Sequence, residues 1–344
     1  MLENQEPGLR AEHLNSFFRP LRRRLTPLIR QLAARPMPRQ DFLYQGYPAM
    51  QQRRFTEKLM RLLGLPPERC RVTEIAHPLT MFTGPDSVRI STRYYEDDVS
   101  RSMYSVLHEG GHALYRLGLP GAWKQTALCE PASPAMDESQ SRFMENIIGR
   151  SLPFCEAVLP LLRDCFPRWP VDVTPQQLCL AVNTVRPSLL RLTADELTYP
   201  IHIMIRCELE QALFEGSLQV RELPGEWDRL YREYLGVKVP DDRSGVLQDM
   251  HWAGGYIGYF PGYALGSAYG PQLLRRMEID RPCLWQHVSR GDLSDVTGWL
   301  EQHIHRYGSL MPPQLLLEQA FGGAFDPESY TDYLTEKYTR LYQL

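Results

Sequence analysis

Apolar residues recur every three or four positions over most of the chain, which is the spacing of amphipathic helices. Between residues 9 and 35 this pattern predicts a helical region that Pro20 and Pro27 bend or divide in two. The same spacing predicts helices over residues 55–63, 99–116, 137–149, 296–305, 314–321 and 327–342. The chain is therefore predicted to be mainly α-helical.

One segment breaks the helical pattern. Residues 72–75 and 87–95 are rich in β-branched and aromatic side chains with partial alternation, and Gly84-Pro85-Asp86 between them is a turn signal. We expect a small antiparallel β-sheet directly before the helix at 99–116. The sequence leaves two interpretations open: the sheet edge binds an extended peptide, or the segment is a purely structural hairpin.

The helix that follows carries His108-Glu109-Gly110-Gly111-His112, an H-E-x-x-H pattern. Residues four apart share one helix face, so both imidazoles can reach one cation while the glutamate deprotonates a water. Each glycine in a helix interior costs about 1 kcal/mol relative to alanine. The pair therefore indicates that the backbone closely approaches substrate or another helix. Accidental spacing is the alternative to the metal site.

A catalytic zinc site needs a third protein ligand. The next predicted helix opens with two acids, Asp137 and Glu138. Asp137 with Gln140 matches a capping box, which places Glu138 in the first turn. A carboxylate there can return to the two histidines, so Glu138 is the candidate third ligand. The alternative is a solvated acid stabilised by the helix N-terminus.

Composition and charge exclude several classes of function. The chain has 344 residues, 43% of them hydrophobic, with a formal net charge of −3 and a pI near 6.3. The chain has no basic excess, so its charge gives no indication of nucleic acid or an anionic membrane surface as a partner. Seven scattered cysteines without a C-x-x-C pattern indicate free thiols in a reducing compartment. With neither a secretory signal nor an apolar stretch of membrane length, the expected location is the cytoplasm.

Several blocks of the sequence, in order, resemble the M32 carboxypeptidases, the family of the thermostable Thermus carboxypeptidase. They are HEGGHALY from 108, DESQSRFMENIIGRS from 137, LRLTADELTYPIHIMIRCELE from 190 and GVLQDMHWAGGYIGYFPGYALG from 245, with further likeness at 77–94 and 304–310. The resemblance implies a mainly α, gluzincin-like fold with a small antiparallel β-sheet beside the active-site groove. It also implies homodimers and the release of single residues from peptide C-termini.

The resemblance further implies one divalent metal ion per chain, usually zinc, with cobalt as a possible substitute. Matched by position, His108, His112 and Glu138 correspond to the metal ligands of the family. Glu109 corresponds to its general base.

Three departures from the family affect these expectations. Asp137 stands where the H-E-S-Q block has histidine, and Ser87 stands where the D-x-R-x-T block has aspartate. Both are expected to affect substrate placement more than metal binding. Family members also carry a long helical region ahead of the part that this chain resembles. Residues 1–344 are therefore expected to form a single catalytic metallopeptidase domain without that region.

Substrate-binding groups are expected in the remaining blocks. Arg191 first, and Arg89 second, can bind a terminal carboxylate through the bidentate guanidinium fork, with a structural salt bridge as the alternative for each. His251 and Tyr263 are expected to stabilise the oxyanion, with Tyr259 as a substrate contact in the same glycine-rich segment. A buried histidine and packed aromatic rings are the alternatives.

Together these features predict a zinc-dependent carboxypeptidase that acts on peptides with a free C-terminus through attack of an activated water. Glu109, His251 and Tyr263 are the predicted catalytic residues, and neither nucleic acid nor membranes are expected as partners. Two alternatives stay open. One is an endopeptidase, or a peptidase of relaxed substrate length, with an open groove. The other is a degenerate form that binds peptide or metal without catalysis.

Overall fold

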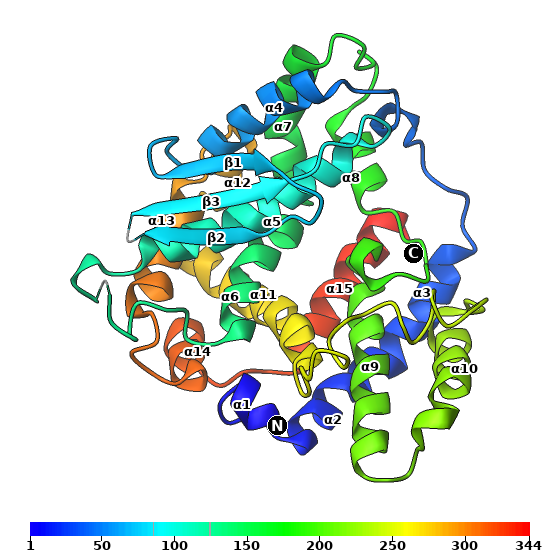
Figure 1. The fold of residues 1–344 in the computed structure, drawn as a ribbon. Coiled ribbons are helices and arrows are strands. Elements are labelled where there is room, and N and C mark those ends of the chain that lie inside the picture. The colour runs from blue at the N-terminus through cyan, green and yellow to red at the C-terminus, as the bar shows by residue number, and fades with distance from the viewer. Residues whose placement is uncertain (85, 124) are drawn as a thin grey trace. The chain divides into compact units, whose positions relative to one another are not determined.

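The computed structural model describes residues 1–84, 86–123 and 125–344, and helices dominate it (Figure 1). The chain divides into two compact units, which are described separately. The first, here called the sheet unit, comprises residues 38–182 and 269–325. The second, here called the terminal unit, comprises residues 1–37, 183–268 and 326–344. The predicted mainly α fold with one small sheet is confirmed.

The sheet unit contains the helices α4 (Ala49–Leu62), α5 (Val99–Gly118), α6 (Pro134–Arg142), α7 (Leu152–Cys165), α8 (Pro175–Val182), α12 (Leu284–Ser289), α13 (Ser294–His303) and α14 (Pro313–Phe321). A π-helical segment, η4 (Phe143–Ile148), continues α6. The central helix is α5, which contacts α4, α6, η4 and the sheet. Its apolar side chains, including Val106, Leu107 and Tyr115, are fully buried.

The sheet has three strands, β1 (Cys70–Glu74), β2 (Thr80–Gly84) and β3 (Ser87–Thr92), in the order β1-β3-β2. The two predicted strands, β1 and β3, pair in parallel, so the prediction of an antiparallel pair is wrong. The antiparallel pair of the sheet is formed by β2 and β3. The reason for the parallel pairing is β2, which was not predicted from the sequence: it reverses the chain once more, so β3 runs in the direction of β1. β2 has no fully buried position and therefore shows no alternating pattern.

The predicted turn at 84–86 includes residue 85, which lies outside the described residues. β2 is an edge strand, and Met81 and Phe82 on it are exposed. An edge strand can pair with a further extended chain. Both interpretations of the sheet, as a peptide-binding edge and as a structural hairpin, therefore stay open.

Two glycines inside α5, Gly110 and Gly111, serve helix packing. A Cβ atom on Gly111 would stand 2.4 Å from the carbonyl oxygen of Gln140 and 2.6 Å from Cα of Ser141, both on α6. A Cβ atom on Gly110 would stand 2.7 Å from Cδ1 of Leu63. Any side chain at 111 would push α6 away, since the obstacle is backbone. The sequence predicted that the backbone at these glycines closely approaches either substrate or another helix. The approach to another helix is present.

The terminal unit contains α1 (Leu2–Gln5), α2 (Ala11–Pro20), α3 (Thr26–Ala33), α9 (Tyr199–Phe214), α10 (Leu223–Leu235) and α15 (Glu328–Tyr342). A π-helical segment, η1 (Leu21–Leu25), separates α2 from α3, so the predicted interruption near Pro20 and Pro27 is confirmed. Proline has no N–H to continue the helical ladder. α11 (Phe260–Asp280) begins in the terminal unit and ends in the sheet unit. Among the described residues, no helix has the length and hydrophobicity needed to cross a membrane.

Candidate active site

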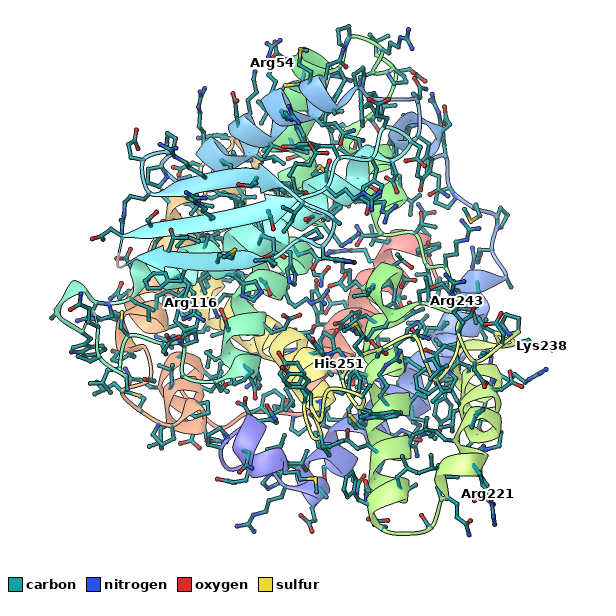
Figure 2. All side chains as sticks on the ribbon, viewed as in Figure 1. Arg54, Arg116, Arg221, Lys238, Arg243 and His251 are labelled. Carbon is teal, nitrogen blue, oxygen red and sulfur yellow. The ribbon has the colours of Figure 1, made fainter. Side chains whose placement is uncertain are left out.

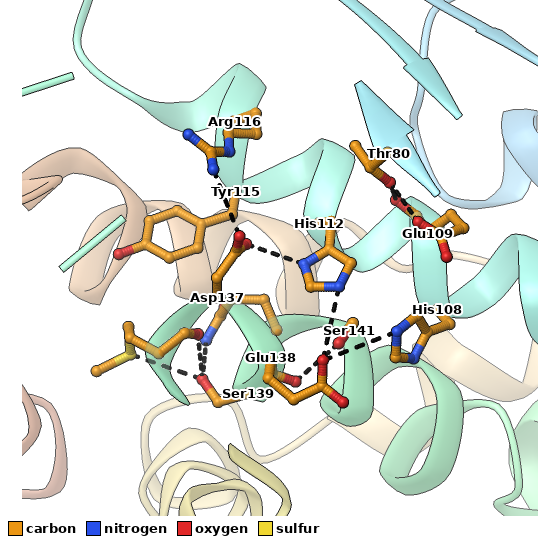
Figure 3. Close-up of polar contacts among 12 residues, drawn as sticks. Thr80, His108, Glu109, His112, Tyr115, Arg116, Asp137, Glu138, Ser139 and Ser141 are labelled. Carbon is orange, nitrogen blue, oxygen red and sulfur yellow. Dashed lines mark hydrogen bonds and ion pairs between the residues drawn. The ribbon is translucent and has the colours of Figure 1, made fainter. Parts of the chain in front are cut away.

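Two helices of the sheet unit bring three metal-ligating side chains together (Figure 3). His108 and His112 lie one turn apart on α5, with ring centroids 5.1 Å apart. Glu138 on α6 places its Oε2 atom 3.9 Å from Nε2 of His108 and 3.8 Å from Nε2 of His112. One ligand atom from each residue lies within 4.8 Å of the others. The three residues named from the sequence therefore meet at one point.

Two further carboxylates orient the imidazoles. Nδ1 of His108 lies 2.9 Å from Oε2 of Glu145, and Nδ1 of His112 lies 2.9 Å from Oδ1 of Asp137. An ionised carboxylate only accepts hydrogen bonds, so each Nδ1 carries the proton and donates it. In the neutral imidazole, the lone pair of each ring then lies on Nε2, the atom that faces Glu138. This carboxylate–histidine arrangement is the usual outer support of a metal ligand.

The electrostatics of the site favour a cation. Burial alone would lower the pKa of His112, but the carboxylates of Asp137 and Glu138 raise this pKa to about 9. Burial would raise the pKa of Glu138, yet the Arg142 guanidinium lowers it, and Arg142 Nε donates to Glu138 Oε1 at 2.7 Å. Glu138 is therefore ionised, with Oε2 left for a ligand. Two imidazoles and one carboxylate are a donor set that suits zinc.

Helix α6 begins earlier than predicted. Its N-cap is Ser133, whose hydroxyl accepts a hydrogen bond from the Met136 amide at 3.1 Å, so the predicted capping box at Asp137 and Gln140 is wrong. Pro134 at the first helical position explains the shift, since its fixed φ suits a helix start. Glu138 consequently lies in the second turn rather than the first, and it is 8% exposed. A solvated acid at the helix N-terminus is thereby excluded.

The role of Asp137 also differs from the expectation. Its Oδ1 binds His112, and its Oδ2 lies 3.5 Å from Nη2 of Arg116. The Asp137 departure from the family therefore acts on a metal ligand rather than on substrate placement. Ser87, the other departure, lies at the exposed start of β3, where its side chain accepts a hydrogen bond from Thr83.

Glu109, the predicted general base, lies next to His108 on α5 and is 6% exposed. Its Oε2 atom accepts a hydrogen bond of 2.6 Å from the hydroxyl of Thr80 on β2, as Figure 3 shows. The sheet therefore contacts the carboxylate on which the predicted chemistry depends.

The terminal unit gathers four of the other predicted residues. His251 lies on the loop before α11 (Figure 2), and its Nε2 atom is 3.2 Å from the hydroxyl of Tyr263 on α11. The ring of Tyr259 lies 5.5 Å from the ring of His251. The Arg191 guanidinium lies 4.8 Å from the ring centroid of Tyr263. Two segments more than fifty residues apart in sequence thus form one cluster.

Arg191 is held by a buried ion pair within this cluster. Its Nε and Nη2 atoms donate to Oδ1 of Asp249 at 3.1 and 2.9 Å, and Arg206 binds the other oxygen of Asp249. Two cations share one carboxylate, so the cluster carries a net positive charge. Burial and the nearby Arg191 charge lower the pKa of His251, which is therefore neutral near pH 7. The salt-bridge alternative for Arg191 is present, and its role toward a substrate carboxylate stays a prediction.

Arg89 belongs to the sheet unit. It lies on the central strand β3 with an exposed side chain. Within the part of the chain that the structure describes, Arg89 forms no ion pair. Its guanidinium therefore keeps all its donors, and its predicted role also stays a prediction.

Three features of the site were not predicted from the sequence: Glu145, Thr80 and the orienting role of Asp137. Glu145 had a usable signal, because it follows Glu138 by seven residues, or two helical turns, and so shares its face. Thr80 had none, since its contact depends on how the sheet packs on α5.

The chain is similar to carboxypeptidases over nearly its whole length. The family model described as carboxypeptidase Taq (M32) metallopeptidase matches residues 1–338. Thermostable carboxypeptidase 1 of Thermus thermophilus is 41% identical over 343 residues, covering 99% of this chain and 67% of that protein. Carboxypeptidase 1 of Bacillus subtilis is 35% identical over 345 residues, covering 100% of this chain and 69% of that protein.

The fold is also similar to solved structures. The crystal structure of an M32 carboxypeptidase from Deinococcus radiodurans R1 matches with a TM-score of 0.97 at 39% identity, covering 100% of this chain and 69% of that chain. The chain thus spans about two thirds of the length of these relatives.

Proposed function

This chain belongs to the carboxypeptidase Taq (M32) metallopeptidase family, and we propose that it is a zinc-dependent carboxypeptidase that releases single amino acids from peptide C-termini. The observation that carries the proposal is the set of His108, His112 and Glu138, with both Nε2 atoms facing the carboxylate. Glu109 lies next to His108 on α5. A metal ligand set with an adjacent buried carboxylate suits hydrolysis by activated water.

In the proposed mechanism, Glu109 accepts a proton from the attacking water, whose oxygen bonds to the carbon of the last peptide carbonyl. Glu109 then donates that proton to the amine nitrogen as the C–N bond breaks, so that an amino acid and a shortened peptide leave. A zinc ion held by the three ligands would supply a lower pKa for water and polarisation of the carbonyl. Asp137 and Glu145 keep each imidazole in the tautomer that can ligate.

Within the terminal unit, we propose that His251 and Tyr263 stabilise the oxyanion and that Tyr259 contacts substrate. The mutual contact of these side chains and the neutral state of His251 support this role, since a neutral imidazole can donate a hydrogen bond. His251→Ala should lower kcat by about 10²–10³-fold with little change in KM, the size of effect that losing one oxyanion donor has. His13→Ala, an exposed histidine of the same unit, is the control. Equal kcat values for the two variants would contradict the role of His251.

The proposed reaction is tested with two peptides that differ only at the C-terminus. The zinc-loaded protein should release the last residue of an N-blocked peptide acid. It should act at least about 100-fold more slowly on the corresponding amide, because a site that pairs with a carboxylate rejects a ligand without one. The free amino acid released per unit time is the measurement. Internal cleavage of the amide would instead favour the endopeptidase alternative.

The same pair of peptides assigns the carboxylate-binding arginine. Arg191→Ala and Arg89→Ala are each tested with both peptides. The variant that loses the preference for the peptide acid over the amide identifies the arginine that binds the carboxylate. Among the described residues Arg89 has no ion-pair partner, whereas the Arg191 guanidinium would have to bind Asp249 and a substrate carboxylate together. If both variants kept the preference, neither arginine would be the recognition group.

Zinc rather than cobalt, the homodimer and the single catalytic domain remain predictions. The cytoplasmic location is also a prediction, supported by seven cysteines that are all free thiols. The buried Glu109 carboxylate beside the three ligands supports catalysis over a degenerate binding form, because a site that only held metal would have no use for it.

A further inference from the structure

The hydroxyl of Thr80 makes a short, directed contact with the predicted general base. Thr80 Oγ1 lies 2.6 Å from Glu109 Oε2 and 3.1 Å from the main-chain oxygen of Glu109. A hydroxyl has one proton to donate, and 2.6 Å is the length of a charge-assisted O–H···O⁻ bond. The proton therefore goes to the carboxylate.

The position of Thr80 is set by the sheet rather than by its own flexibility. Its backbone pairs with Ile90 on the central strand β3. The adjacent residue, Leu79, is tied at both its N–H and its carbonyl to the hydroxyl of Ser91, each at 2.8 Å. Ser91 is itself 5% exposed, and β3 packs on α5. The Thr80 hydroxyl is thus a donor on a rigid element, aimed at a neighbouring helix.

Thr80 also decides the orientation of the carboxylate. In the part of the chain that the structure describes, it is the one side chain that hydrogen-bonds the Glu109 carboxylate. With Oε2 engaged, Oε1 is the oxygen left to accept a proton. Burying a carboxylate with a single hydrogen bond is unfavourable for folding, so stability does not account for the pair.

We propose that Thr80 is a positioning residue for the hydrolysis proposed above, on which this inference rests. Its hydroxyl holds Oε2 of Glu109 and so turns Oε1 toward the reacting water. Among the described residues, the Thr80 hydroxyl bonds Glu109 and none of the three metal ligands, and in this role it does not contact the substrate. Its effect should consequently appear in the chemical step and not in substrate or metal binding.

The test compares Thr80→Val, Thr80→Ser and Thr83→Val in the zinc-loaded full chain. Valine keeps the shape of threonine and removes the donor, so Thr80→Val should lower kcat by about 10–100-fold with KM nearly unchanged, as for a misplaced catalytic group. Thr80→Ser keeps the donor and should restore most of kcat. Thr83→Val is the matched control, because Thr83 lies on the same strand but bonds Ser87. Zinc content should be equal in all variants.

A second measurement does not depend on turnover. The melting temperatures of Thr80→Val, Glu109→Ala and the double variant, all without metal, should shift non-additively, because each single substitution removes the same hydrogen bond. A Thr80→Val enzyme with wild-type kcat, a Thr80→Ser enzyme as slow as Thr80→Val, or additive melting shifts would overturn the role of Thr80 and leave the proposed function standing. A wild-type protein that releases no amino acid would overturn both.

Discussion

Replacing Glu109 with glutamine should lower kcat for release of a C-terminal amino acid by about 10²–10⁴-fold, the contribution typical of a general base. Glutamine has the shape of glutamate and still offers Thr80 an oxygen to bond, but it cannot take a proton from water. His108, His112 and Glu138 are untouched, so the variant should bind as much metal as the wild type. Turnover of an N-blocked peptide and metal content per chain are the two measurements.

The control for Glu109→Gln is Glu57→Gln. Glu57 is an exposed glutamate on α4 in the same unit, and its substitution should change neither measurement. If Glu109→Gln turned over peptide within a few-fold of the wild type, the base would have to be another group. If it lost metal as well as turnover, its role would be in the ligand set.

Replacing Glu138 with glutamine should abolish stable metal binding and, with it, turnover. Glutamine keeps an oxygen for Arg142, but its NH₂ group has no lone pair to ligate a cation, and two imidazoles do not complete a zinc site. Removal of metal by a chelator should also abolish turnover in the wild type. Adding zinc back should restore turnover in the wild type but not in Glu138→Gln. Metal per chain after dialysis is the measurement.

The orienting carboxylate should have a smaller effect on the same measurement. Asp137→Ala should weaken metal affinity by about 10–100-fold through His112, which loses the group that fixes its tautomer. Excess zinc should restore its turnover, unlike that of Glu138→Gln. Glu130→Ala is the matched control, because Glu130 pairs with the same Arg116 but, in the described part of the chain, forms no ion pair with an imidazole. Equal zinc affinity in Asp137→Ala and Glu130→Ala would contradict the proposal that Asp137 orients His112.

Local spacing was sufficient for part of this site. His108 and His112 share a face because four residues make about one helical turn, a property that needs no tertiary structure. Glu109 follows from its place beside them. The helix interruption near Pro20 and Pro27 was predictable for the same reason, since a proline removes a hydrogen bond wherever the chain goes.

Other features depended on contacts between segments. Strand β2 was missed because its side chains are largely exposed and carry no period, and without it the sheet was assigned the wrong pairing. The capping box at Asp137 was a valid local signal, but Ser133 and Pro134 begin the helix one turn earlier. Asp137 is therefore not the N-cap of α6, and its carboxylate binds His112.

The sequence by itself determined the helical class, the two histidines with their glutamate, and, through resemblance, the family. The tertiary structure alone decided which oxygen of Glu138 faces the imidazoles, which carboxylates hold them, and that Thr80 binds Glu109. The physical reason lies at Gly111, where the absence of a side chain lets α6 approach α5 until their backbones are in contact. Helical periodicity places a residue on a face of its own helix, but only the packing of the two helices brings Glu138 to the cation.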